Sequence, residues 1–205
     1  MIWMTPCFRA DILVIANAYV RDEFRNHPAM TPPSAFSDEE IERVRRWVES
    51  GGNLLVLADH APLGGGSSKL AEAFGFTYLN GHATAGRNTQ TPEIRHVVIT
   101  FKPNQGLNTN TPVTDGSTGR KPIQVFHTFG GQAFISAPDA MQVLTIPEGW
   151  SAIFTYKLAE EIRTAPRIDA SGMAQGAIME VGKGRVAIFG EAGGFTAQVS
   201  AKIWD

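Results

Sequence analysis

The sequence has one cysteine, almost no net charge and no long apolar run, and each shortage excludes a class of protein. Cys7 has no second cysteine to pair with, which excludes an intrachain disulfide and a zinc site built from several cysteines. A formal charge of -2 provides no basic surface, so we expect no nucleic-acid partner. No apolar stretch approaches the roughly 20 residues that span a bilayer. We therefore expect no membrane span and a soluble chain, in the cytoplasm or the periplasm.

The composition that remains is that of an ordinary globular domain. The 205 residues are 43% hydrophobic and 19% charged, which is enough apolar material to build a core. The sequence therefore predicts one domain spanning residues 1–205.

Two apolar runs and the segment between them predict a strand, a helix and a second strand. Residues 11–16 and 54–58 are continuous apolar runs rich in β-branched or aliphatic side chains, typical of strands covered on both faces. Ser37 and Glu40 have the spacing of a capping box, which predicts the start of the helix. The two glycines that begin at Gly51 predict its end.

Later segments predict a short helix and several strands. The short helix is expected to begin at Ser67 or Ser68 and to end near Phe74. Residues 176–181 and 185–189 predict a β-hairpin, because the glycines between them permit a tight turn.

Polar side chains directly follow two of the predicted strands. Asp59 and His60 follow the second apolar run, and Glu191 follows the last one. Because open α/β sheets bind ligands beyond the carboxyl ends of their strands, we predict that these three residues share one rim as catalytic groups. Adjacent residues point in different directions, so Asp59 and His60 need Glu191 as the third group. The structural alternative is that Asp59 caps a turn and Glu191 accepts backbone amides.

Four further residues are predicted to bind ligand near this rim. His127 ends an extended segment, and Gln198 follows Glu191 on the segment after the last strand. Gly65 and Ser67 belong to a glycine-rich run whose amides would hold an anion at a helix N-terminus. The alternatives are structural: a half-buried histidine, a glutamine on a helix surface and a serine that caps a helix.

Three motifs, in this order, resemble a known family. They are DILVIANAY, WVESGGNLLVLADHAP and GKGRVAIFGEAGGFTAQ. They resemble uncharacterised bacterial domains of the class I glutamine-amidotransferase-like (flavodoxin-like) fold, in particular the family called DUF4350, which is similar to the ABC-associated gliding-motility domains. The resemblance covers residues 11–76 and 123–198. It implies an α/β fold, a three-layer sandwich with a mainly parallel central sheet and a C-terminal β-hairpin.

The resemblance also implies a domain truncated at both ends. Family members carry an upstream strand and helix and a terminal helix that this chain lacks, and Asp59, His60 and Ala61 stand where the amidotransferases have their cysteine. A missing first strand leaves an unpaired sheet edge, which predicts a homo-oligomer.

Two functions fit these observations. The first is a small hydrolase, in which Asp59, His60 and Glu191 activate water on a small polar or ester-type ligand, alone or through a divalent metal ion. The alternative is a non-enzymatic module that binds a ligand or a partner in the same crevice. Convergent side chains would favour the enzyme, and side chains tied to backbone amides would favour the binding module. Neither the substrate nor a cofactor follows from the sequence.

Overall fold

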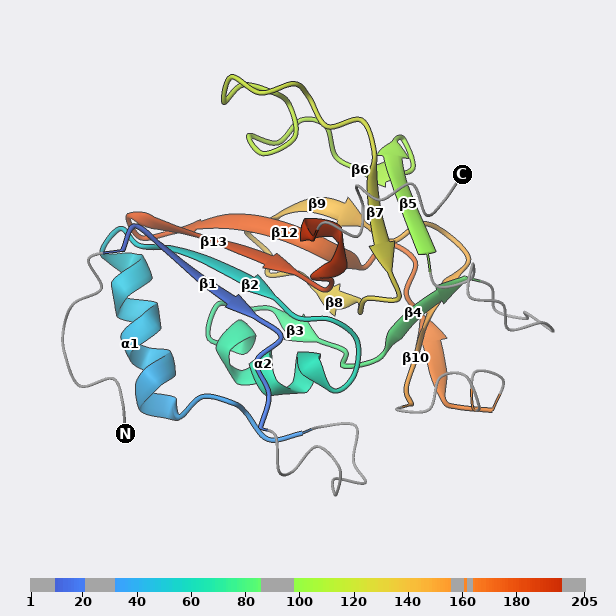
Figure 1. The fold of residues 1–205 in the computed structure, drawn as a ribbon, viewed down its shortest axis with the longest axis horizontal. Coiled ribbons are helices and arrows are strands. Elements are labelled where there is room, and N and C mark those ends of the chain that lie inside the picture. The colour runs from blue at the N-terminus through green and yellow to red at the C-terminus, as the bar shows by residue number, and fades with distance from the viewer. Residues whose placement is uncertain (1–9, 21–31, 86–97, 156–160, 162–163, 197–205) are drawn as a thin grey trace.

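The structure is a computed structural model that describes residues 10–20, 32–85, 98–155, 161 and 164–196. Strands predominate among these residues, and the two α-helices lie on one side of the large sheet (Figure 1). The helices are α1 (Asp38–Glu49) and α2 (Leu63–Glu72), and a 3-10 turn covers Gly193–Phe195. The strands are β1 (Ile12–Ala16), β2 (Asn53–Leu57), β3 (Thr77–Tyr78), β4 (His82–Ala85), β5 (Val98–Pro103), β6 (Gly106–Leu107), β7 (Phe126–Phe129), β8 (Phe134–Ile135), β9 (Met141–Thr145), β10 (Trp150–Ile153), β11 (Arg167–Asp169), β12 (Ala174–Val181) and β13 (Gly184–Phe189).

Helix α1 begins at the predicted capping box. The backbone N–H of Glu40 donates to Ser37 Oγ at 3.3 Å, and the backbone N–H of Ser37 donates to Glu40 Oε2 at 2.9 Å. These two bonds satisfy donors that the first helical turn leaves free. The buried residues Ile41, Val44 and Val48 then face the sheet.

Strands β1, β2 and β13 are parallel and form one end of the large sheet. β1 pairs with β2 from Ile12 opposite Asn53, and β13 pairs with the other side of β2. The predicted strand–helix–strand unit is confirmed. Because the three strands run in the same direction, their carboxyl ends lie at the same edge of the sheet.

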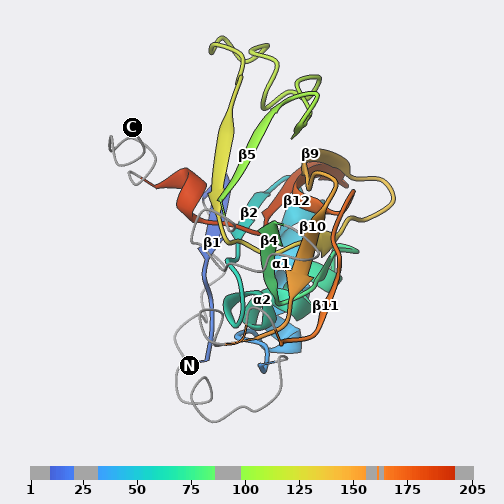
Figure 2. The same cartoon turned by 90° about the vertical axis from the view of Figure 1, so that its right-hand side faces the viewer.

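The predicted three-layer sandwich with a mainly parallel sheet is wrong. The sheet is mixed, curls into a half-barrel and has the order β1-β2-β13-β12-β9-β6-β5-β7. β12 and β13 form the predicted hairpin, and β12 continues antiparallel to β9. A second sheet has the order β11-β10-β4. The physical reason is that the described segments between α2 and β12 form short strands instead of crossover helices, so helices cover only one face (Figure 2).

The core consists of two clusters on opposite faces of the sheet. The helix-side cluster packs α1 and α2 against side chains such as Val56 and Ile188. The far-side cluster contains Leu57 and Phe189, which alternate with those residues along the same strands, and it continues under β10 through Ala152.

The short helix begins earlier than predicted. α2 begins at Leu63, directly after Pro62, so Ser67 lies inside the helix and caps nothing. Ser68 Oγ donates to the carbonyl of Gly64 at 3.1 Å, which is also a bond within the helix.

The glycines of α2 are explained by tertiary packing. A Cβ on Gly64 would collide with the Gln132 side chain, and a Cβ on Gly65 would collide with Pro32. Close approach therefore selects glycine here in spite of its poor helix propensity. No helix formed by the described residues is long and apolar enough to cross a membrane.

Candidate functional site

Asp59 joins the ends of the three parallel strands. Its Oδ2 accepts a hydrogen bond from Asn17 Nδ2 at 2.7 Å, and its backbone N–H donates to Asn17 Oδ1 at 2.9 Å. Its Oδ1 accepts a hydrogen bond from the backbone N–H of Ala192. Asn17 follows β1 and Ala192 comes shortly after β13, so one side chain connects segments that are far apart in the sequence.

Glu191 is buried at the same edge, with 4% of its surface exposed. Its Oε2 accepts a hydrogen bond from the backbone N–H of Phe129 at 2.8 Å, and its Oε1 accepts one from Gly193 at 2.6 Å. The carboxyl group therefore fixes the end of β7 against the turn that follows β13.

Asp59 and Glu191 form an acidic pair. Burial, the negative charge of Asp59 and a hydrogen bond with its side chain raise the pKa of Glu191 to about 7. The backbone amides of Phe129 and Gly193 act in the opposite direction. The predicted proximity of the segments near residues 59 and 191 is confirmed, whereas their catalytic role stays a prediction.

His60 lies near this edge but pairs with a different residue. Its ring stacks on His82 with 4.2 Å between ring centroids and an angle of 23° between the planes. Its Nδ1 hydrogen-bonds with the carbonyl of Ala61 at 2.9 Å. The hydrogen bonds of the described residues do not connect His60 with Asp59 or Glu191.

His82 is a buried neutral histidine that we had not predicted as a site residue. Its Nε2 hydrogen-bonds with the carbonyl of Thr155 at 3.0 Å, and its Nδ1 has no hydrogen-bond partner among the described residues. Burial first and the neighbouring His60 second lower the pKa of His82 to about 4. The ring is therefore uncharged at neutral pH. Among the described residues, no three His, Cys, Asp or Glu side chains come together in a way that could hold a metal ion.

The described residues that were predicted to bind ligand contact other partners or none that the structure describes. His127 lies on β7, half-buried, and its Nδ1 hydrogen-bonds with Thr100 Oγ1 at 3.0 Å. The backbone N–H of Gly65 donates to Asn80 Oδ1 at 2.9 Å, which leaves it no donor for an anion. Ser67 is fully buried, and its hydroxyl has no partner. Gln198 lies outside the described residues.

Sequence reasoning missed two polar residues that organise this edge. Asn17 makes hydrogen bonds with both the side chain and the backbone N–H of Asp59. It directly follows an apolar strand, so the rule that polar residues after such strands belong to a site applies to it as well. Gln132 is fully buried, and its Nε2 donates to the carbonyls of Ala58 and Asp59 at 2.9 and 2.8 Å. No local pattern marks Gln132, because only the fold brings it to residues more than seventy positions away.

A neutral depression lies elsewhere, between β6 and β9. It has a volume of about 450 Å³ and is lined by amide and hydroxyl side chains, among them Asn104, Asn110 and Gln142. Among the described residues, its lining contains no acidic or basic side chain that could act as a general acid or base.

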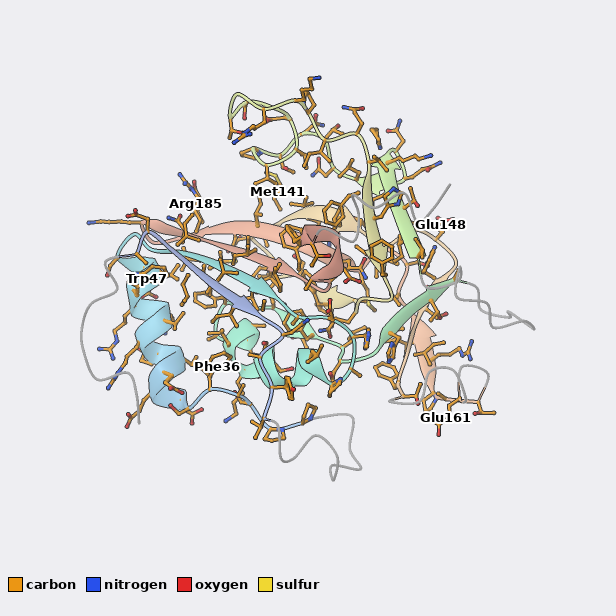
Figure 3. The ribbon with its side chains drawn as sticks, viewed as in Figure 1. Phe36, Trp47, Met141, Glu148, Glu161 and Arg185 are labelled. Atoms are coloured by element: carbon orange, nitrogen blue, oxygen red, sulfur yellow. The ribbon has the colours of Figure 1, made fainter. Side chains whose placement is uncertain are left out.

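An apolar row crosses the face of the sheet opposite the two helices. Consecutive register partners from β1 to β9 make up this row: Val14, Leu55, Ala187, Ile178 and Met141. Val14 is 54% exposed and Met141 is 44% exposed, while the three residues between them are half-buried. Figure 3 shows Met141 and Arg185 on this side of the sheet, and Trp47 and Phe36 on the helix side.

Comparisons with known proteins identify a similar fold. No family model and no curated protein matches the sequence. The chain is similar to a solved structure described as the mmIFT52 N-terminal domain, at 14% identity and a TM-score of 0.55, over 92% of this chain and 68% of that one. At this identity the similarity concerns the fold alone.

Two cytoplasmic proteins from Salmonella typhimurium also match. They align over 88% and 89% of this chain and 60% and 61% of their own, at 15% and 14% identity, with TM-scores of 0.39 and 0.40. This chain therefore spans about three fifths of their length.

Proposed function

We propose that this chain is a non-enzymatic module that binds another protein through the apolar row and the adjoining edge strand β1. The observation that carries the proposal is the apolar row, whose two ends, Val14 and Met141, are exposed. The three residues between them are half-buried and pack against the far-side cluster. Sheet faces of this kind are normally covered by a helix or a second sheet, because leaving them in water costs roughly 25 cal/mol per Å² of apolar surface. Exposed apolar side chains at the ends of such a row are typical of a protein–protein contact.

The acidic pair supports the same proposal. Each oxygen of Asp59 and Glu191 already accepts a hydrogen bond from this chain, and three of the four donors are backbone amides. Carboxylates held in this way fasten strand ends, and about half of their acceptor sites are already used. His60 is turned toward His82, so it is not placed to assist them.

A first experiment tests whether the row binds apolar surfaces. We expect the variants V14K and M141K to lose at least half of the fluorescence enhancement of the apolar dye bis-ANS. The matched control is I168K, because Ile168 is 42% exposed but lies on β11 in the second sheet. Equal dye binding by the row variants and the wild-type protein would overturn the proposal.

One observation favours hydrolysis as a second candidate function. A carboxyl group with a pKa of about 7 beside a second carboxyl group is suited to general acid–base catalysis. A panel of esters and amides, with and without divalent cations, separates the two functions. We expect no turnover that depends on Glu191, so that wild type and E191Q give the same background rate. Turnover that falls tenfold or more in a folded E191Q protein would establish the hydrolase instead.

The resemblance to DUF4350 also remains a proposal. It rests on the three motifs at the strand ends and not on the comparisons, and it carries no assigned activity to this chain.

A further inference from the structure

Among the described residues, nothing pairs with the outer side of β1. β1 is the terminal strand of the large sheet, and within the described residues it pairs only with β2. The backbone N–H of Asn53 donates to the carbonyl of Asp11, and the backbone N–H of Asn17 donates to the carbonyl of Leu57. Odd-numbered residues of this segment therefore direct their backbone groups to β2. The N–H and C=O groups of Ile12, Val14 and Ala16 point away from the sheet.

Within the part of the chain that the structure describes, this edge lacks the features that usually keep edge strands apart. Natural edge strands carry a charge, a proline or a bulge, or they are covered by another element. β1 reads Ile-Leu-Val-Ile-Ala, pairs with β2 without a register shift and contains neither charge nor proline. Ile12 is 62% exposed and Val14 is 54% exposed, so the strand presents apolar side chains as well as free backbone groups.

We infer that the occupant of this edge is β1 of a second copy of the chain, paired antiparallel about a two-fold axis at Val14. This inference rests on the proposed function and names the partner of the same surface. The axis places Val14 opposite Val14 of the second copy and Ile12 opposite Ala16 of the second copy. Each of the three residues whose backbone groups point outward then lies opposite another such residue. Every outward N–H of one copy can therefore donate to an outward C=O of the other.

The charges near β1 agree with this register. The two-fold axis sets Asp11 of one copy beside Asn17 of the other, a carboxylate next to an amide. The two Asp11 side chains are then six residues apart along the paired strands, or about 20 Å at roughly 3.4 Å per residue. A parallel pairing in register would place them side by side, which is unfavourable.

The pairing also extends the apolar row. Val14 ends the row in each copy, so the axis joins the two rows into one apolar strip across both sheets. Two strands of five residues bury less than the about 1,600 Å² of a standard interface. We therefore expect a concentration-dependent dimer with a dissociation constant on the order of 1 to 100 μM.

Sedimentation velocity from 1 to 300 μM tests the dimer. We expect the wild-type chain to shift from monomer to dimer across this range. V14P removes an outward N–H and leaves every hydrogen bond between β1 and β2 in place, so it should remain monomeric at 300 μM. V14A keeps that N–H and is the matched control that should still dimerise. Circular dichroism and melting curves establish that each variant is folded.

A charge exchange tests the register even if the proline variant does not fold. V14K alone and V14E alone should each remain monomeric, because the axis places two like charges opposite each other. An equimolar mixture of V14K and V14E should recover a dimer that contains one of each.

A wild-type chain that is monomeric at every concentration would overturn the inference, as would a dimer that V14P and V14K leave unchanged. A monomer in which the row still binds bis-ANS would refute the second copy but keep the proposed binding function. Equal bis-ANS fluorescence from the wild type, V14K and M141K, or turnover that depends on Glu191, would refute the proposed function itself.

Discussion

Glu191, at the edge of the sheet, fixes the local structure and also makes the stability of the protein depend on pH. Glu191 is buried against Asp59, and its pKa is raised to about 7 from an ordinary value of 4.5. A folded-state pKa above the unfolded one means that folding favours the protonated form. The resulting contribution to stability is fully present below pH 4.5 and is lost as the pH rises through about 7.

We therefore predict that stability falls between pH 5 and pH 8. A raised pKa of this size corresponds to about 3 kcal/mol of unfolding free energy, at roughly 1.4 kcal/mol per pH unit. Urea unfolding at both pH values measures the loss. E191Q removes the titration, so most of the difference should vanish in that variant, whereas E180Q, at an exposed glutamate on β12, should retain it. An equal pH dependence in E191Q and wild type would contradict this assignment.

Substitutions of Asn17 separate the contribution of its hydrogen bonds to stability from that of its backbone conformation. It has a φ of 50° and makes two hydrogen bonds with Asp59. Glycine in N17G adopts the positive φ without strain but cannot make the two side-chain hydrogen bonds. We therefore expect the free energy of unfolding to fall by about 1–3 kcal/mol. N17A also places a Cβ in the left-handed region, which adds about 1 kcal/mol. Chemical denaturation of both variants checks the order, and N17A as stable as N17G would exclude backbone strain at this site.

At the scale of elements, local signals determine α1, and packing determines α2. The capping box fixes where α1 begins, because its two hydrogen bonds are formed between residues three apart. The sequence places the cap of α2 at Ser67 or Ser68, five or six residues after the observed cap at Pro62, because the glycine-rich run favours a turn. The residues that require those glycines, such as Gln132 and Pro32, come from distant parts of the chain.

The cap of α1 gives a prediction at this scale. S37A should destabilise the protein by about 1 kcal/mol, because it removes the side-chain acceptor for the Glu40 N–H. S37G should cost only a few tenths of a kcal/mol. Thermal melting distinguishes the two variants. S37A with an unchanged melting temperature would show that the cap adds nothing to global stability.

At the scale of the whole molecule, the large sheet joins the two core clusters. Phe76 is fully buried in the helix-side cluster and Phe101 in the far-side cluster, and β2 and β13 contribute residues to both. We expect the described part of the chain to unfold in one transition.

F76A and F101A test this cooperativity. Each substitution should lower the free energy of unfolding by about 3–5 kcal/mol, because it removes buried surface and leaves a cavity. Both should lower the melting temperature of the same transition. Near-ultraviolet and far-ultraviolet circular dichroism should then follow the same melting curve. Two separate transitions, each moved by one variant only, would show that the clusters fold independently.

The sequence by itself determined the features that depend on neighbours along the chain. These are the strand–helix–strand unit, the capping box of α1 and the hairpin of β12 with β13. The rule that polar residues after parallel strands share one edge also brought Asp59 and Glu191 together correctly, because parallel strands end on the same side.

Only the tertiary structure decided what the remaining strands do and which partners the polar groups take. Strand pairing depends on contacts between distant residues, so the second half of the chain gave no local sign that it would add antiparallel strands and leave one face without helices. The same holds for His60, which stacks on His82 and not on the acidic pair. Hydrogen-bond partners and burial arise from the packed fold, and local patterns do not contain them.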